Sequence, residues 1–215
     1  MNALVKAENK DLMTQARGAL KNNWVLGLGV FVIFLLIMIA VQRIPKVGGL
    51  VSFVITGPMM VGMAGIYLSI SRDQDTEVSR LFDGFKKFGV SFAAYFLQFI
   101  FILLWALLLI IPGILAALSY SMTYYIISEN DSIGPLEAIT KSKEMMQGNR
   151  WRLFCLGFRF FGWSLLCILT LGIGFLWLFP YMYVSFARFY VDLNSDSEET
   201  LKHHVEIPLP DGYTG

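Results

Sequence analysis

Long runs of apolar residues, each ended by a short polar segment, make up most of the chain between residues 22 and 187. A helix that crosses the hydrocarbon core of a bilayer needs about 20 mostly apolar residues, and a charge at its centre is costly. The first charge-free run covers residues 22–42 and the second covers residues 47–71, with the short turn 43–46 between them. Each of these runs predicts one membrane-spanning helix.

The third and fourth runs are too long for single spans. Residues 88–128 carry no charge, and as one straight helix they would be about 60 Å long, twice the hydrocarbon thickness. A turn is predicted at residues 111–113, Ile111-Pro112-Gly113, because proline lacks the N–H that a helix interior uses and glycine tolerates unusual backbone angles. Residues 153–187, interrupted only by Arg159, need a turn for the same reason, and residues 170–174 supply it.

The predicted fold is all-α, a polytopic membrane helical bundle at residues 1–193 with six transmembrane helices arranged as three hairpins. The polar residues 194–215 are predicted to be a disordered cytoplasmic tail. Pro58 and Pro180 fall inside predicted spans, where proline either kinks or breaks a helix. The predicted spans are residues 23–42, 47–71, 89–111, 113–128, 152–171 and 174–191.

Three polar segments predict amphipathic helices at the cytoplasmic interface, one before each hairpin. In the second segment, Leu81 and Phe85 recur at helical spacing opposite Lys86. The third opens after Ser132 as a candidate cap, with Pro135 in its first turn. The chain therefore resembles three copies of an interfacial helix followed by a hairpin, although any multi-span protein alternates hairpins and polar loops. The segments are residues 4–21, 77–88 and 133–147.

The positions of lysine and arginine predict the orientation, because positively charged loops stay on the cytoplasmic side. Four basic residues precede the first span, four follow the second and four follow the fourth, whereas only Arg43 and Lys46 fall on the opposite side. We therefore expect a multi-pass protein of the cytoplasmic membrane, with both termini in the cytoplasm and very small external loops.

Composition supports this placement and excludes several partners. The 215 residues are 56% hydrophobic and 15% charged, with a mean hydropathy of +0.60, so the chain lacks the polar surface of a soluble domain. The formal net charge of +1 argues against a nucleic-acid partner, which would require a basic surface. The expected partners are the lipid bilayer, including anionic phospholipid, and an unidentified membrane protein.

Several motifs in combination resemble those of one bacterial family. They lie at residues 81–85, 111–114, 119–122, 137–149, 151–154, 161–163, 171–174, 180–182 and 189–190. The chain is similar to the uncharacterised integral membrane family known as domain of unknown function nine-seven-five, and in plan to the membrane domain of some glycerophosphodiester phosphodiesterases. The resemblance covers about residues 1–193 and implies a membrane architecture, but it implies no activity and transfers no catalytic residue.

The candidate ligand contact is a pair of arginines. Arg159 is the one ionisable residue inside a predicted span, and Arg152 lies seven residues before it on the same helical face. One interpretation is that the Arg159 side chain extends back to the cytoplasmic headgroups. The sharper hypothesis is that Arg152 and Arg159 form a ladder that holds a lipid phosphate or another anion, since guanidinium groups suit phosphate oxygens.

Catalysis, metal binding and cofactor binding are not expected. The only histidines, His203 and His204, lie in the polar tail, and no phosphate-binding loop, zinc-protease motif or nucleophile elbow occurs. The acids Glu129, Asp131, Glu137 and Glu144 cluster near Lys141 and Lys143, where surface pairing is the ordinary explanation.

Two functions therefore remain. The first is a non-enzymatic scaffold or accessory protein that acts at the inner leaflet, suggested by the absence of acids inside the spans and by the amphipathic cytoplasmic segments. The alternative is a carrier of a lipid or amphiphilic small molecule, suggested by the hairpin repeat, the prolines inside the spans and the arginine ladder.

Overall fold

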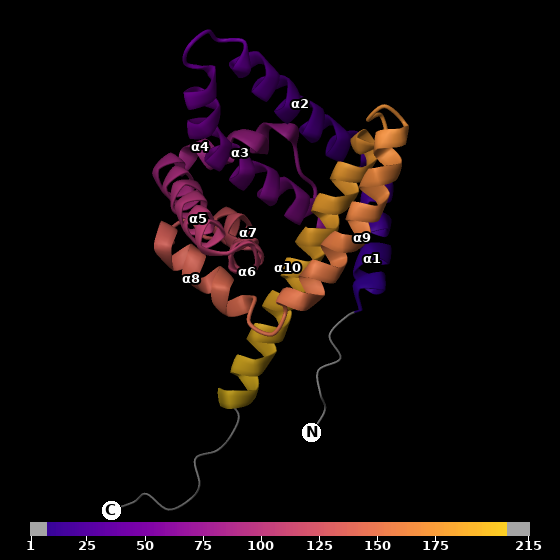
Figure 1. The fold of residues 1–215 in the computed structure, drawn as a ribbon. Helices are drawn as coiled ribbons and strands as arrows, with labels where there is room; N and C mark the ends of the chain where they lie inside the picture. The colour runs from indigo at the N-terminus through magenta and orange to yellow at the C-terminus, as the bar shows by residue number, and fades with distance from the viewer. Residues whose placement is uncertain (1–7, 206–215) are drawn as a thin grey trace, which may run out of the picture.

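The structure is a computed structural model that describes residues 8–205, with the side chains of all of them except Leu108 and residues 196–205. Over this part of the chain every regular element is a helix and no strand occurs, which confirms the all-α prediction (Figure 1). The elements are α1 (Asn9–Lys21), α2 (Trp24–Gln42), α3 (Gly48–Ser71), the 3-10 helix η1 (Val78–Phe82), α4 (Asp83–Lys86), α5 (Phe88–Leu108), α6 (Ile110–Tyr120), α7 (Thr123–Glu129), α8 (Pro135–Met145), α9 (Arg150–Leu169) and α10 (Phe175–Val205).

Within the described residues, five helical stretches are long and apolar enough to cross a membrane. The predicted sixth span, residues 174–191, forms the first part of α10, which is not one of the five. This helix combines its apolar residues with Pro180, several tyrosines and Arg188. A membrane protein is thus supported, and the count of six spans stays a prediction. The five stretches are Trp24–Gln42, Gly48–Ser71, Phe88–Leu107, Ile110–Glu129 and Arg150–Leu169.

The turn predicted at Pro112 and Gly113 is misplaced by three residues. The chain leaves the helical conformation at Leu109, with φ −162° and ψ 142°, and Pro112 is the third residue of α6. Proline is tolerated there because the first four N–H groups of a helix have no partner within it. The span predicted at residues 113–128 is also not one straight helix, since it is divided into α6 and α7 at residues 121–122.

The other predicted breaks have different outcomes. The turn at residues 170–174 lies where the sequence places it, with Leu171 and Gly172 at positive φ of 55° and 87°. Pro58 and Pro180 do not break their helices, because α3 and α10 continue through them. Neighbouring helices pack closely at both prolines and stabilise the backbone there.

The polar segments before the hairpins are less regular than predicted. The helix expected at residues 77–88 is a 3-10 helix followed by one α-helical turn, with Lys87 (ψ 36°) separating it from α5. Gly84 in its middle lowers the helix propensity of this short segment. The predicted cap Ser132 is also wrong, because Gly134 caps α8 and Pro135 is its first residue.

The two ends of the chain complete the comparison. The first polar segment begins as α1 at Asn9, and its predicted residues 4–7 lie outside the described residues. Residues 194–205 were expected to be disordered but continue α10, because a helix already formed extends easily into good helix formers such as glutamate, leucine and lysine. Residues 206–215 of the predicted tail lie outside the described part.

Three pairs of consecutive helices form hairpins: α2 with α3 (first), α5 with α6 (second) and α9 with α10 (third). In each pair, a glycine near the start of the second helix lies against the residue seven positions earlier, which belongs to the first helix. A Cβ at Gly48 would lie 2.7 Å from the Val41 carbonyl oxygen, one at Gly113 2.9 Å from Ala106 Cα, and one at Gly174 2.7 Å from Cys167 Sγ. The three hairpins share this contact at one spacing, and the repeat of an interfacial helix followed by two spans stays a prediction.

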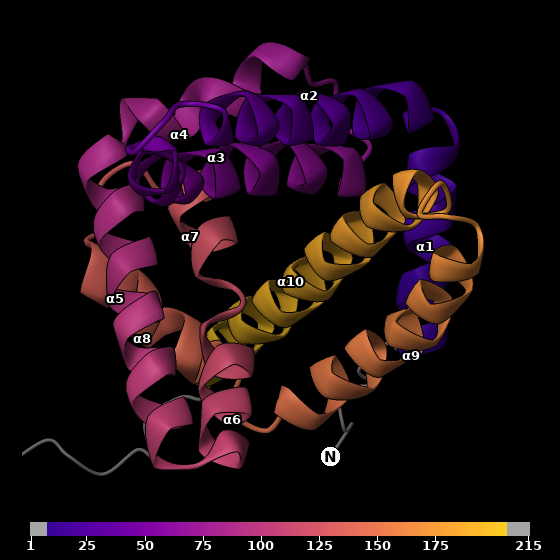
Figure 2. The ribbon, with the colours of Figure 1, turned by 45° about the horizontal axis from the view of Figure 1, so that its top comes forward.

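The hairpins lie along three sides of a triangle, and the tip of each reaches the base of the next (Figure 2). Near the tip of the first, Phe53 packs edge-on against Phe92, Phe96 and Phe99 at the start of α5. At the tip of the second hairpin, Trp105 and Pro112 line a cavity together with Arg150, the first residue of α9. At the tip of the third hairpin, Gly174 and Trp177 line a second cavity together with Trp24, the first residue of α2. The hairpins therefore cannot stand parallel to one another. The turn of the third hairpin lies beside the start of α2, whereas the six-span prediction places these two segments on opposite sides of the membrane.

The bundle is centred on α3, whose C-terminal half is buried on most sides. Tyr67 is fully buried, donates a hydrogen bond to the Gly27 carbonyl at 3.0 Å and stacks on Tyr183 with the ring centroids 5.0 Å apart. These contacts join α3 to α2 and α10 in one apolar core. Such complete burial accounts for the all-round apolar character of α3.

The polar segment before the second hairpin is fixed against α3 by two glycines. A Cβ at Gly62 of α3 would lie 1.9 Å from the Leu81 carbonyl oxygen, and a Cβ at Gly84 of α4 would lie 1.9 Å from the Pro58 carbonyl oxygen. Only glycine permits backbone contacts this close. The segment is therefore packed into the bundle through Leu81, which is fully buried, while Phe82 and Phe85 remain exposed.

We expect the substitution Gly84→Ala to destabilise the protein by about 3 kcal/mol, at the upper end of the usual cost of overpacking, because a backbone carbonyl cannot move aside as a flexible side chain can. Gly89→Ala is the matched control, since a Cβ there has no atom within 4 Å. Thermal unfolding of the detergent-solubilised variants, followed by size-exclusion chromatography, measures the difference. Equal loss of stability in both variants would contradict the packing.

Candidate functional site

Charged side chains from five parts of the chain meet at one end of the bundle. At the end of α3, Arg72 forms an ion pair with Glu129, the last residue of α7. The second carboxylate oxygen of Glu129 accepts a hydrogen bond of 2.6 Å from the Tyr190 hydroxyl of α10. The Arg72 and Glu129 side chains are 30% and 27% exposed. This contact therefore joins three helices in a partly buried setting, where ionic hydrogen bonds are stronger than in open water.

A second contact connects the loop after α7 to the base of the second hairpin. The Lys87 ammonium lies 2.5 Å from an Asp131 carboxylate oxygen and donates a hydrogen bond of 2.7 Å to the Ile127 carbonyl. Lys87 is largely buried, whereas Asp131 is open to solvent. The hydrogen bond and the positive charge of Lys87 hold the pKa of the Asp131 carboxyl below its ordinary value.

Two further pairs bring α9, α10 and the start of α1 to the same place. Arg152 of α9 pairs with Asp192 of α10 at 2.7 Å, and Arg188 of α10 lies 3.2 Å from Asp73. The side chain of Asn9, the first residue of α1, donates to the Arg152 carbonyl at 2.9 Å. We call this set of charged residues the polar end. Its members are Arg72, Asp73, Arg80, Asp83, Lys86, Lys87, Glu129, Asp131, Arg152, Arg188 and Asp192.

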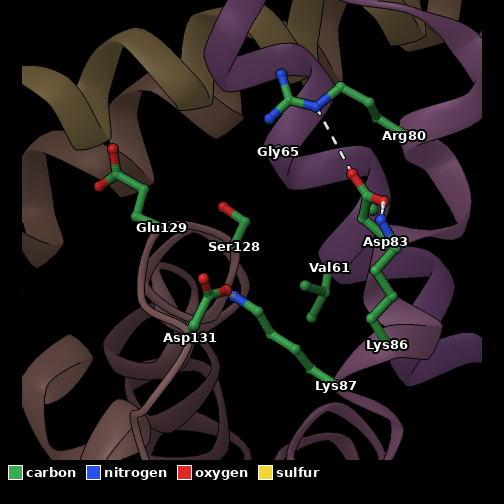
Figure 3. Close-up of a pocket in the computed structure, with 10 residues that line it drawn as sticks. Val61, Gly65, Arg80, Asp83, Lys86, Lys87, Ser128, Glu129 and Asp131 are labelled. Atoms are coloured by element: carbon green, nitrogen blue, oxygen red, sulfur yellow. Dashed lines mark ion pairs between the residues drawn. The ribbon is translucent and has the colours of Figure 1, made fainter.

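A cavity of about 570 Å³ opens at the polar end (Figure 3). Figure 3 shows Arg80, Asp83 and Lys86 on one side of it and Glu129 and Asp131 on the other, with Lys87 reaching across to Asp131. Asp83 pairs with Lys86 at 2.8 Å and lies 3.6 Å from Arg80. The lining thus carries three basic and three acidic residues around an apolar floor from α3. It comprises Val61, Gly62, Gly65, Arg80, Asp83, Lys86, Lys87, Ser128, Glu129 and Asp131.

This balanced lining suits a partner with both charges better than it suits a small anion or cation. Every acid that lines it has a basic neighbour within ion-pairing distance in the cavity or just behind it. In the part of the chain that the structure describes, no group of three metal-ligating side chains comes together. The arrangement can recognise a charged polypeptide segment or a zwitterionic group.

The two predicted ligand residues do not act as one ladder in the structure. Arg152 is engaged by Asp192, and its guanidinium lies 5.0 Å from the centre of the Phe189 ring. Arg159 points to α1, where it donates a hydrogen bond of 3.5 Å to the sulfur of Met13. Their role as an anion contact stays a prediction, with Arg152 already neutralised by a carboxylate.

The acidic cluster expected at residues 129–144 is divided by the fold. Glu129 and Asp131 pair with Arg72 and Lys87, which lie far away in the sequence, instead of with Lys141 or Lys143. The carboxylate of Glu137 accepts a hydrogen bond of 3.5 Å from the Gly134 N–H at the start of α8. Sequence reasoning missed Arg72, Tyr190 and Asp192 as members of a shared site. One feature of the sequence could have identified them: each of the three lies where an apolar run ends and polar residues begin.

Comparison with known proteins agrees with the resemblance found in the sequence. The sequence model of the family described as "Protein of unknown function (DUF975)" matches residues 106–197. Over these residues the match is to the family that the motifs predicted. No curated protein and no solved structure matches the chain. The similarity in plan to the phosphodiesterase membrane domain stays a prediction.

The matched segment contains five of the eleven residues of the polar end. It runs from the end of α5 into α10 and includes Glu129, Asp131, Arg152, Arg188 and Asp192. Their partners Arg72, Asp73 and Lys87 lie before it in the chain. The polar end therefore connects the segment that matches the family to the end of α3 and to the start of α5.

We expect Glu129→Gln to lower the free energy of unfolding by about 1 to 3 kcal/mol, because it leaves Arg72 without its carboxylate partner in a partly buried site. Lys86→Gln is the control, since this side chain is 79% exposed and a surface pair contributes about 0.5 kcal/mol. Chemical denaturation in detergent compares the two variants. A loss for Lys86→Gln as large as for Glu129→Gln would contradict the central role of the Arg72–Glu129 pair.

Proposed function

We propose that this protein is a non-enzymatic scaffold or accessory protein of the bacterial cell membrane, which acts at the inner leaflet by binding a membrane protein partner at its polar end. The observation that carries the proposal is the charge-balanced cavity of about 570 Å³. It is built from the end of α3, the η1–α4 segment and the end of α7, so a partner that fills it contacts several segments at once.

The membrane placement follows from charge. The polar end collects the segments that the positive-inside rule assigns to the cytoplasm, and both Asn9 and Asp192 contact it near Arg152. We therefore place the N-terminus and the C-terminus in the cytoplasm. The lipid bilayer, including its anionic phospholipids, is the other proposed partner, and nucleic acid is not one.

The carrier alternative has less support. It was suggested in part by prolines that interrupt spans, and α3 and α10 are continuous through Pro58 and Pro180. It was also suggested by a ladder of Arg152 and Arg159. In the structure Arg152 forms an ion pair with Asp192. A scaffold requires neither a broken helix nor a charge at the membrane midplane.

A photo-crosslinking amino acid at position 86 tests the partner hypothesis. We expect the probe in place of Lys86, which lines the cavity, to capture a different polypeptide in native membranes, identified by mass spectrometry. The same probe at Ile44, in the turn of the first hairpin, is the control and should capture none. Charge reversal in the Lys87→Glu variant should weaken the capture at position 86. Capture of lipid and of this chain alone would contradict an accessory role.

Labelling with a membrane-impermeant maleimide tests the placement. In a background without Cys155 and Cys167, the variant Ser195→Cys should label only after the cells are permeabilised, because residue 195 follows the polar end on α10. Ile44→Cys should label in intact cells. Labelling of residue 195 in intact cells would place the polar end outside and overturn the inner-leaflet location.

A further inference from the structure

Two arginines on different helices converge at the junction of α1 with the third hairpin. Arg17 of α1 lies over the ring of Tyr181 in α10, with its guanidinium carbon 5.6 Å from the ring centre. Arg159 of α9 donates its hydrogen bond to the Met13 sulfur, one turn before Arg17 on α1. Both guanidinium groups are within electrostatic range of the Tyr181 hydroxyl, which itself donates a hydrogen bond of 3.1 Å to the Met13 carbonyl.

These two charges differ from the cations of the polar end. Across the described residues, the ion pairs involve Arg72, Arg80, Lys86, Lys87, Arg152 and Arg188, and none joins an acid to Arg17 or Arg159. The hydrogen-bond partner of Arg159 is a thioether, a weak acceptor. Both side chains are exposed. Two neighbouring guanidinium groups in this setting favour a ligand that supplies negatively charged oxygen atoms.

An apolar groove leads away from this pair. A cavity of about 300 Å³ is lined by Arg17 and Tyr181 at one end and by Cys167 and Gly174 at the other. From Tyr181 to Gly174 the distance along α10 is about 10 Å, at a rise of about 1.5 Å per residue. Three tryptophans, Trp24, Trp163 and Trp177, and Leu178 complete the lining. The groove combines a cationic end with an apolar length, as a phospholipid requires.

The depth of the groove also fits a headgroup. Trp24 opens α2, and tryptophan is enriched at membrane–water interfaces. Helix α1 carries polar residues on its exposed face, including Lys10, Thr14 and Lys21, and so belongs at the interface. Because Arg17 shares this helix, it lies at the level of the lipid phosphates and not at the midplane.

We propose that Arg17 and Arg159 bind the phosphate of an anionic phospholipid, with part of one acyl chain in the groove between Trp24, Trp163 and Trp177. The pairing of Arg159 with Arg17 replaces the ladder of Arg152 and Arg159 predicted from the sequence. It rests on the inner-leaflet placement of the proposed function. It does not depend on the cavity at the polar end or on a protein partner.

Tryptophan quenching by lipids with brominated acyl chains tests the site. The full chain is placed in nanodiscs that contain phosphatidylglycerol in excess phosphatidylcholine, with either the first or the second lipid brominated at the same mole fraction. We expect stronger quenching by brominated phosphatidylglycerol, because each arginine near an anionic lipid raises binding about fivefold, or about thirtyfold for two. Quenching that follows mole fraction alone, equal for both lipids, would overturn the proposal.

Three variants make the result specific. Arg17→Gln with Arg159→Gln should abolish the excess quenching, and Arg43→Gln, an exposed arginine in the turn of the first hairpin, should retain it. Replacement of Trp24, Trp163 and Trp177 by Phe should leave Trp105 and Trp151 with quenching that follows mole fraction. Retention of the excess quenching in the double variant, or in the three-Phe variant, would place the lipid elsewhere and overturn the proposal.

Two further measurements separate the source of the phosphate and the two proposals. Inorganic phosphate at millimolar concentration should not reduce the excess quenching, because it lacks the acyl chain that the groove holds; full competition would overturn the assignment to a lipid. Crosslinking from position 86 should be unchanged in the double arginine variant. In the unsubstituted chain, crosslinking from position 86 without excess quenching would refute this lipid site alone, and excess quenching without crosslinking would refute only the protein partner.

Discussion

The cost of placing charge in hydrocarbon is the constraint from which the rest of this structure follows. The apolar runs contain almost no ionisable residue, so the charged residues must gather where the runs end. The fold brings several of those ends together, and the charges then pair across elements: Arg72 with Glu129, Lys87 with Asp131 and Arg152 with Asp192. The result is a polar end that closes the bundle and forms a cavity on its surface.

Close backbone contacts allow the apolar part to be compact. Gly48, Gly113 and Gly174 each let one helix of a hairpin touch the other at the same spacing, and Gly62 and Gly84 fix the η1–α4 segment against α3. Helices in lipid gain little from hydrophobic burial against one another, so packing of this kind contributes much of their association. The hairpins are inclined so that the tip of each reaches the base of the next (Figure 2).

This arrangement explains why the two proposed binding sites differ in chemistry. At the base of the second hairpin, cations and acids from separate elements balance and leave a charged cavity suited to a polypeptide. At the base of the first hairpin, Arg17 lines an apolar cavity with three tryptophans, and Arg159 from the middle of α9 adds a second positive charge beside α1. One site therefore has a lining with both charges, whereas the other combines positive charge with an apolar groove.

The sequence predicted the helical class, the approximate limits of most helices and the turn at residues 170–174, because length and hydropathy limit what an apolar run can form. It did not determine the turn at Leu109, the 3-10 segment before α5 or the helix at residues 194–205, which depend on packing and on local backbone energies of a few kcal/mol. Only the tertiary structure decided which charges meet. Arg159 and Arg17, or Arg72 and Glu129, are far apart in the chain, and no periodicity relates residues that come together only when the hairpins cross.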